Sequence, residues 1–343
     1  MKTETLSSTS LRLMNFRTAN PRRTVPRHHG VRHSRGAAII MAMLIMALST
    51  VIISGLFWRQ NVTVRSIENR LALSQTRWIE RAATDWARVI LRQDLNISVV
   101  DHLGEIWALP VAETKMDETV TAGAKIDNGS TNASLSGHII DMQGRFNLNN
   151  LVQNGIPNPL EIESFGQLLT IISLPKGLAD ALVEHLISIS KKPAAAAAEP
   201  NSSKSNGASG FALKRTADLV QIKGFDPRVI SVLDPFVVIL PVPSKININT
   251  ASAEVIAARV AGLDLAAARS LVVQREKAFF PSIAKAASLL NLSQGLPDAL
   301  WSVSSSYFLV RGVVKFERVE SRSDTLLERK PDKTIEVIWQ DRY

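Results

Sequence analysis

Residues 37–58 read AAIIMAMLIMALSTVIISGLFW and contain no charged side chain. A helix of these 22 residues would be about 33 Å long, at about 1.5 Å per residue. That length is sufficient to cross a bilayer hydrocarbon core of roughly 30 Å. The apolar core of a cleaved secretory signal has only roughly 7–15 residues. We therefore expect this segment to remain in the protein as a single transmembrane helix.

Basic residues are concentrated in front of the apolar segment. Residues 1–35 contain eight Lys or Arg and one acid, Glu4, whereas the rest of the chain balances 32 bases against 30 acids. The positive-inside rule then predicts a cytoplasmic N-terminus and a large domain on the other side of the membrane. Because most of the net charge of +9 comes from the leader, it does not indicate a nucleic-acid-binding surface. Met14 is an alternative translation start that would shorten the leader.

The helical pattern continues beyond the apolar segment. Residues 59–95 contain neither Pro nor Gly, and charged residues fill most positions between the apolar ones. We expect one continuous helix of about 55–60 residues, on the order of 85 Å long. Its second part is amphipathic, and we expect a globular domain to pack along the apolar stripe. The stripe follows steps of three, four or seven residues and consists of Ile67, Leu71, Trp78, Ala82, Trp86 and Val89.

Strands are expected on both sides of a mainly helical block. Short apolar stretches in residues 96–150 predict the first strands. Residues 306–343 alternate apolar and polar side chains, as in an antiparallel sheet with one solvated face, with strands expected at 306–320, 323–328 and 334–340. The fold class is therefore α+β, with a long helix on an antiparallel sheet and the helical block inserted between the strands.

The helical block contains a weak internal repeat. LADALV at residues 178–183 resembles LAAARSLV at 265–272, which predicts two small helical units at about 151–240 and 241–305. Residues 191–210, KKPAAAAAEPNSSKSNGASG, offer little apolar surface to bury and predict a mobile surface loop within the first unit.

The start of the long helix resembles a type IV prepilin signal. A basic leader ends in Ser34-Arg35-Gly36, and the apolar run begins at Ala37. The resemblance implies that a prepilin peptidase cuts between Gly36 and Ala37 and methylates the new amine. The fifth residue of the product would be Met41, where pilins and most pseudopilins carry a glutamate. This departure narrows the resemblance to minor pseudopilin K of type II secretion systems, which lacks that glutamate.

Two later segments support the same family. DMQGRFNLNN at residues 141–150 and KININTA at 245–251 resemble segments that lead into its two helical subdomains. The resemblance implies a pilin-like fold in which the inserted block forms two sterile-alpha-motif-like subdomains. The domains would then be a leader at 1–36, the membrane span 37–58, the amphipathic helix 59–95, strands at 96–150, the subdomains 151–240 and 241–305, and strands at 306–343.

The resemblance also implies a function and partners. It predicts a non-enzymatic protein of the cell inner membrane that nucleates the pseudopilus at its tip. Its partners would be I-type and J-type minor pseudopilins, the major pseudopilin, the prepilin peptidase and either the outer-membrane secretin or cargo. The assembly residues would include Ile67, Leu71 and Trp78 of the stripe. Calcium binding is implied by the resemblance alone; acid-rich stretches occur at 117–118 and 127–128, but their spacing selects no ligands.

A DNA-binding receptor is the alternative function. Residues 247–254, NINTASAE, resemble the opening of a helix-hairpin-helix unit, with the hairpin expected at 260–264. Leu263 and Asp264 suit a phosphate poorly, and basic residues are sparse there. The plainer interpretation is that Asn249 or Thr250 caps a helix.

No pattern in the sequence indicates an enzyme. The chain has no cysteine, so disulfides, thiolate zinc sites and a cysteine nucleophile are excluded. Outside the leader the histidines are His102, His138 and His185, and none has metal-pair spacing.

Overall fold

The computed structural model describes residues 35–115, 133–190, 212–290 and 295–343. The chain divides into two compact units, Met1–Val64 and Arg65–Tyr343. Nearly all of the predicted leader, the predicted loop at 191–210 and the acid-rich stretches at 117–118 and 127–128 lie outside the described residues.

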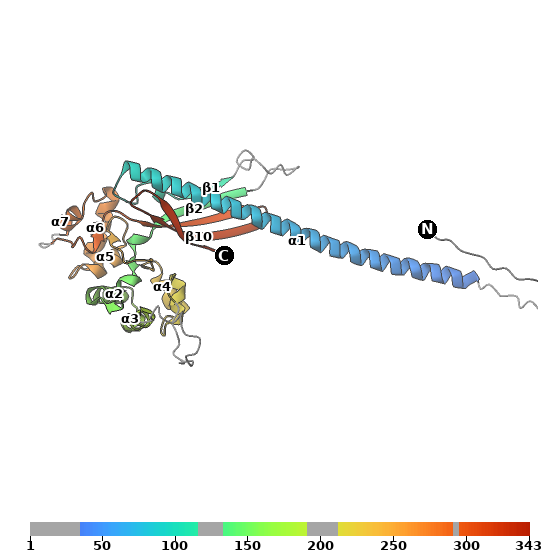
Figure 1. Cartoon of the computed structure of the whole chain (residues 1–343), viewed down its shortest axis with the longest axis horizontal. Helices are drawn as coiled ribbons and strands as arrows, with labels where there is room; N and C mark the ends of the chain where they lie inside the picture. Colours follow the sequence, from blue (N-terminus) through green and yellow to red (C-terminus); the bar gives the residue numbers. More distant parts are fainter. Residues whose placement is uncertain (1–34, 116–132, 191–211, 291–294) are drawn as a thin grey trace, which may run out of the picture. The chain divides into compact units, whose positions relative to one another are not determined.

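Helix α1 runs from Arg35 to Ile97 and contains 63 residues (Figure 1). Within the described residues it is the helix whose length and apolar character would allow it to cross a membrane. Its large apolar side chains in the first unit, such as Ile40, Leu48 and Phe57, are all exposed. The predicted long N-terminal helix is therefore confirmed, and it is slightly longer than the sequence pattern indicates.

The second unit contains a five-stranded sheet in the order β1-β2-β9-β10-β11, and all neighbouring strands are antiparallel. Strand β2 lies beside β9, so the helical block between them in the sequence is an insertion into the sheet. The predicted α+β class is confirmed. The strands are β1 Val111–Lys115, β2 Ala133–Asp141, β9 Tyr307–Phe316, β10 Val319–Arg329 and β11 Ile335–Arg342.

The hairpin between β9 and β10 turns earlier than the sequence pattern indicates. Phe316 pairs with Val319, so the turn consists of Glu317 and Arg318. The expected break at residues 321–322 is wrong. Glu317 adopts the left-handed conformation with φ 52°, which lets a two-residue loop reverse the chain without glycine.

Two short parallel pairings join the beginning and end of each helical unit. Strand β3 pairs with β6, and β7 pairs with β8. The strands are β3 Phe146–Asn147, β6 Val237–Val238, β7 Ile246–Asn247 and β8 Trp301–Ser302. The helices are α2 Pro159–Ile171, α3 Gly177–Ser190, α4 Pro227–Leu233, α5 Ala253–Arg259, α6 Leu265–Lys277 and α7 Ile283–Leu289.

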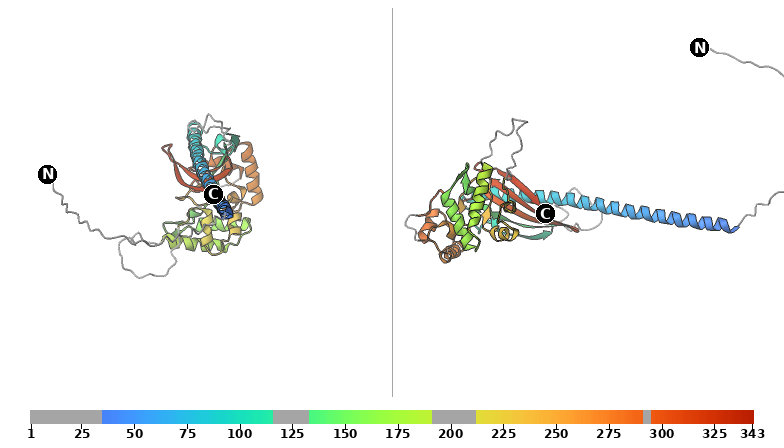
Figure 2. Two further views of the ribbon diagram at one scale, coloured as in Figure 1. Left: turned by 90° about the vertical axis from the view of Figure 1, so that its right-hand side faces the viewer. Right: turned by 90° about the horizontal axis from the view of Figure 1, so that it is seen from below.

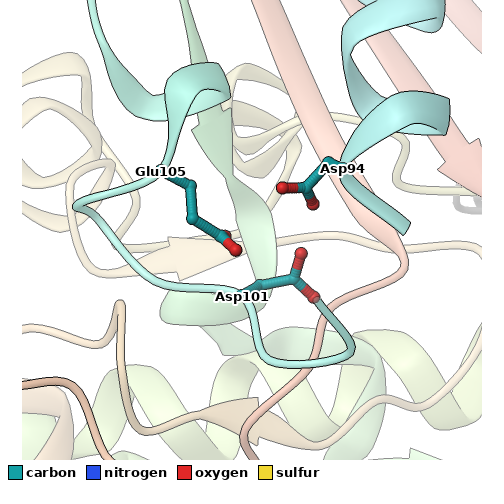
Figure 3. A group of neighbouring side chains, drawn as sticks. All are labelled: Asp94, Asp101 and Glu105. Carbon is teal, nitrogen blue, oxygen red and sulfur yellow. The ribbon is translucent and has the colours of Figure 1, made fainter. Parts of the chain in front are cut away.

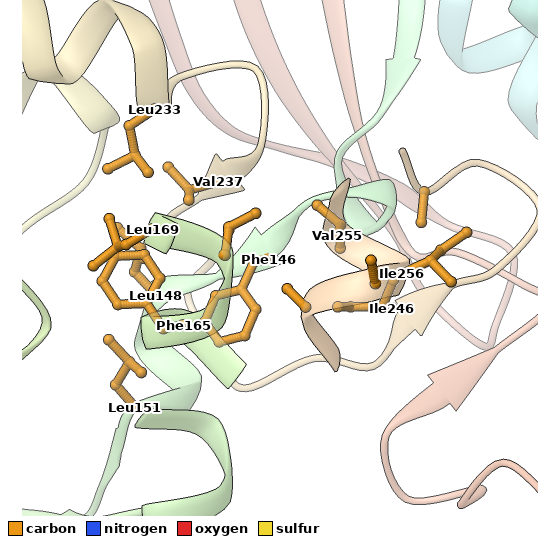
Figure 4. Close-up of a cluster of buried hydrophobic side chains, with 14 of the residues drawn as sticks. Phe146, Leu148, Leu151, Phe165, Leu169, Leu233, Val237, Ile246, Val255 and Ile256 are labelled. Atoms are coloured by element: carbon orange, nitrogen blue, oxygen red, sulfur yellow. The ribbon is translucent and has the colours of Figure 1, made fainter. Parts of the chain in front are cut away.

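The two helical units share one hydrophobic core (Figure 4). Phe146 and Phe165 stack in it with their ring centroids 5.6 Å apart. Glu161 of α2 and Arg259 of α5 form a buried ion pair, with Arg259 Nη1 2.6 Å from Glu161 Oε2. Both partners of such a pair must be present, because either charge alone would be buried without compensation.

Candidate functional site

The second half of α1 packs on the sheet through a face of mostly small or polar side chains. Figure 2 shows this part of the helix lying along the strands. Ala87 and Leu91 contact Phe308 and Leu327 in one cluster, and another cluster holds Ala72 and Ile79. The remaining buried residues of this face are Thr76, Glu80 and Thr84.

The polar side chains on this face are all hydrogen-bonded. The hydroxyls of Thr76 and Thr84 donate to helix carbonyls four residues earlier. The carboxylate of Glu80 accepts from Arg342 Nε at 2.5 Å and from the Ser321 hydroxyl. Because these bonds satisfy the buried groups, a face with little apolar surface can still pack stably on the sheet.

The predicted apolar stripe lies on the other side of the helix. Leu71 is 54% exposed and Trp78 66% exposed, and Ile67, Trp86 and Val89 are also exposed. The expectation that the chain's own globular domain packs along this stripe is wrong. The sheet instead packs on the face with small and polar side chains. Because Glu80 and two threonines lie on that face, a hydropathy pattern does not identify it as buried. The role of Ile67, Leu71 and Trp78 in assembly stays a prediction, and this exposure leaves them free to contact another protein.

The predicted processing site lies at the start of α1. Gly36 and Ala37 are in its first turn, and Met41 is exposed one turn later. Cleavage between Gly36 and Ala37 stays a prediction.

Three carboxylates meet where α1 ends (Figure 3). Oxygen atoms of Asp94, Asp101 and Glu105 lie within 4.8 Å of one another. Arg329 of β10 bonds two of them, with Nη1 3.1 Å from Asp94 and Nη2 on Asp101. Burial, reinforced by the charges of Glu105 and Asp101, raises the pKa of Asp94 to about 7 despite the contact with Arg329. Burial also raises the pKa of Asp101.

This cluster fits an internal ion pair better than a calcium site. The guanidinium of Arg329 already lies between two of the carboxylates. Glu105 Oε2 accepts from Trp107 Nε1 at 2.7 Å and from the backbone amide of His102 at 2.9 Å. Calcium requires six to eight oxygen ligands that are free to face the ion. Calcium binding by this chain therefore stays a prediction without assigned ligands.

A second polar cluster joins the two segments that carry the family resemblance. Asp141 Oδ2 accepts hydrogen bonds from Asn247 Nδ2 at 3.1 Å, Thr250 Oγ1 at 2.6 Å and Ser305 Oγ at 2.6 Å. Its other oxygen accepts from the amide of Gln143 at 2.8 Å. Burial raises the pKa of Asp141 to about 6. These hydrogen bonds have a structural role, because they connect strand β2 to the second helical unit.

The remaining polar residues of residues 145–150 have similar structural roles. Arg145 donates to the carbonyl of Asp234, and Asn149 donates to the carbonyl of Leu240. Asn147 accepts from the backbone amides of Asn149 and Leu240. These long-range bonds hold the first helical unit against its entry segment. Sequence spacing alone gives no signal for them.

The candidate DNA-binding hairpin is present as a turn between α5 and α6. Gly262 adopts φ +76° in this turn. Arg259, however, is buried against Glu161, and Arg269 faces Glu254 at 3.7 Å. The helix cap is Ser252, which accepts from the amide of Val255, and not Asn249 or Thr250. Asn249 instead bonds Phe280 through both side-chain atoms. These contacts do not favour phosphate binding.

Comparison with known proteins finds similarity to one family. Two family models match this chain, at residues 144–242 and 246–304, and both describe protein K of the type II secretion system. A protein from Pseudomonas aeruginosa strain PAO1, named type II secretion system protein K, is 28% identical over 325 residues. The match covers 90% of this chain and 93% of that protein. The chain is therefore similar to type II secretion system protein K over most of its length.

A solved relative of the protein K family has the same fold. The crystal structure of the GspK-GspI-GspJ complex from the type 2 secretion system of enterotoxigenic Escherichia coli contains a chain that matches with a TM-score of 0.62. The two chains are 19% identical, and the match covers 80% of this chain and 98% of the other. The resemblance to protein K that the sequence indicates is confirmed by the family models and the P. aeruginosa protein.

Proposed function

We propose that this chain, which is similar to protein K, acts at the tip of the type II secretion pseudopilus. It would be a non-enzymatic protein of the inner membrane, with its N-terminus in the cytoplasm and its globular part in the periplasm. There it would nucleate pseudopilus assembly for the export of folded proteins. The observation that carries this proposal is the exposed apolar stripe on a helix that also contains the membrane span.

Met41 supports a position at the tip. After cleavage between Gly36 and Ala37 it would be the fifth residue of the mature chain. A thioether has no negative charge, so Met41 cannot neutralise the N-terminal amine of another subunit. A subunit without this contact suits the end of a filament, where no further helix is stacked above it.

The stripe supports helix packing with other minor pseudopilins. Five apolar side chains of α1 remain exposed on one face, and a patch of this kind marks a protein-protein contact. The structural relative is in a complex with GspI and GspJ, which suggests I-type and J-type minor pseudopilins as partners here. The helical block would then face the outer-membrane channel or cargo.

Processing is tested by mass spectrometry of the purified chain from cells with and without the prepilin peptidase. We expect an N-terminus at methylated Ala37 only when the peptidase is present. An unprocessed N-terminus in both strains would contradict the pseudopilin proposal.

The stripe is tested by paired alanine substitutions. We expect Leu71→Ala with Trp78→Ala to reduce co-purification of I-type and J-type pseudopilins, and secretion, by at least tenfold. The matched control is Arg70→Ala with Arg77→Ala, two exposed residues of the same turns that lie outside the stripe. Equal effects of the two pairs would exclude the stripe as the assembly surface.

Salt-dependent binding of the full chain to duplex DNA would support the alternative function as a DNA-binding receptor.

A further inference from the structure

An apolar hollow lies beside the last turns of α1. Its walls are Val89, Ile90, Ile97, Ile106 and Phe279, the last of which belongs to the segment after α6. Ile97 is 72% exposed and Ile106 70% exposed, although both border a cavity that could cover them. Such large exposed side chains around a hollow are typical of a binding surface for another protein.

A second hollow lies beside the first one along the helix. Ile90, Ile106 and Trp107 line both. The second hollow reaches Trp86 and Leu109, which are themselves exposed.

Carboxylates line the first hollow from one side. Asp94 and Glu105 both border it, and Asp101 lies next to them (Figure 3). Within the described residues, the permanently cationic side chain that bonds this group is Arg329, and of the three acids it pairs with Asp94 and Asp101. His102 Nε2 lies 3.9 Å from Glu105, but its Nδ1 accepts a bond from the amide of Gly104. Three acids therefore face one permanent cation.

The pKa of Asp94 is raised mainly by burial, and the neighbouring acids add to the shift. Burial and the two neighbouring acids raise its pKa to about 7, even though Arg329 opposes the shift. A second cation near Asp94 and Glu105 would favour the ionised carboxylates and reduce this repulsion. An anionic partner would increase it.

We propose that this hollow binds a segment of a partner protein that places one Lys or Arg against Asp94 and Glu105 and apolar side chains against Ile97, Ile106 and Phe279. The apolar walls exclude a simple cation site, because a hydrated ion gains nothing from them. Arg329 already lies between Asp94 and Asp101. The Lys or Arg of the partner therefore approaches Asp94 and Glu105 from the hollow that they border. The proposal does not depend on a position at the pseudopilus tip, because the hollow is separate from the Ile67–Trp78 part of the stripe.

The test uses the full chain in phosphatidylcholine nanodiscs and two fluorescent peptides. The probes are acetyl-Leu-Ile-Arg-Ile-Leu-amide and the same peptide with citrulline, which keeps the shape of arginine without its charge. We expect the arginine peptide to bind at least tenfold more tightly by fluorescence anisotropy, after subtraction of binding to empty nanodiscs. Equal affinities, or no binding of either peptide at 1 mM, would overturn the proposal.

Three variants locate the binding. Asp94→Asn keeps an acceptor for Arg329 and is expected to reduce the preference for arginine at least fivefold. Asp85→Asn, an exposed acid of the same helix, is the matched control and should leave it unchanged. Ile106→Ser changes an exposed side chain, so folding is preserved, and it should weaken both peptides to a similar extent. A preference that survives Asp94→Asn, or binding unaffected by Ile106→Ser, would place the peptide elsewhere and refute the proposal.

Discussion

The two faces of the second half of α1 show the reverse of the burial expected for an ordinary amphipathic helix. The face that packs on the chain's own sheet consists mainly of Ala, Thr and one Glu, together with Ile79 and Leu91. The face that carries Leu71, Trp78 and Trp86 is exposed. The more apolar face of a helix normally turns toward the core. Here that apolar face stays exposed, so the apolar character of a face does not decide which face of this helix packs on the sheet.

The buried face remains stable because hydrogen bonds replace apolar area. Small side chains allow close contact with the sheet, and Glu80 joins two strands through Ser321 and Arg342. In the part of the chain that the structure describes, the stripe side chains on the exposed face are apolar and form no such bonds. Substitutions on the buried face should therefore lower the stability of the chain, whereas substitutions on the exposed face should affect assembly.

The largest difference is expected for the same change on the two faces. Leu91 is fully buried, so Leu91→Ala should lower the free energy of unfolding by about 2–5 kcal/mol, through lost apolar contacts and a cavity. Leu71→Ala removes the same atoms from an exposed position and should change it by less than about 0.5 kcal/mol. Urea denaturation of both variants in mild detergent, followed by tryptophan fluorescence, measures the difference. A large loss of stability in Leu71→Ala would mean that the stripe packs within the chain.

A smaller difference is expected for two glutamates of the helix. Glu80 has no exposed side-chain surface and accepts from Arg342 and Ser321. Glu80→Gln keeps its shape but removes its charge, which should cost about 1–3 kcal/mol, because hydrogen bonds to a charged group are the stronger ones.

Glu68 provides the matched control on the same helix. Its side chain is 47% exposed and lies 2.9 Å from Arg318. Glu68→Gln should change stability by no more than about 1 kcal/mol, since exposed ion pairs contribute little. The same urea titration compares the two variants. If Glu80→Gln and Glu68→Gln lower the free energy of unfolding by equally small amounts, Glu80 does not stabilise the packing of the buried face on the sheet.

Local patterns in the sequence predicted much of the fold. The uncharged run to Trp58 and the absence of Pro and Gly after it predict helix α1, and alternation predicts the C-terminal strands. The choice of face on α1 was not predictable in this way, because the buried Glu80 bonds Ser321 and Arg342, both far along the chain. The position of the hairpin at Glu317 was not predictable either, since no Gly or Asn marks its left-handed residue.

The polar clusters were the least predictable part of the candidate site. The motif segments identified the family, but not that Asp141 of one bonds Asn247 of the other. Asp101 and Arg329 meet through the tertiary fold alone. No spacing rule predicts a contact between residues so distant in sequence, and histidine or cysteine patterns, which do mark metal sites, are missing from these segments.

The smallest expected effect is a pH dependence that originates where α1 ends. The pKa of Asp94 is about 7 in the folded chain and near 3.9 in an unfolded one. Between these values the folded state binds the proton more tightly, so stability contributed by protonated Asp94 is present at low pH and is lost as the pH rises toward 7. Asp94→Asn removes this dependence. Between pH 5 and pH 8 the wild-type chain should therefore lose on the order of 1 kcal/mol relative to the variant, a value reduced from the full shift because solvent reaches part of the group.

Urea titrations at several pH values measure this difference, and Asp85→Asn, at an exposed position of the same helix, should follow the wild-type curve. If wild type and Asp94→Asn instead show parallel curves, Arg329 must compensate Asp94 fully in the folded chain. The three carboxylates at the end of α1 would then carry no uncompensated negative charge, although Arg329 is the one permanent cation beside them. In that case the two faces of the helix would differ in apolar surface alone, and the hollow beside Ile97 and Ile106 would have no electrostatic preference for a cationic segment.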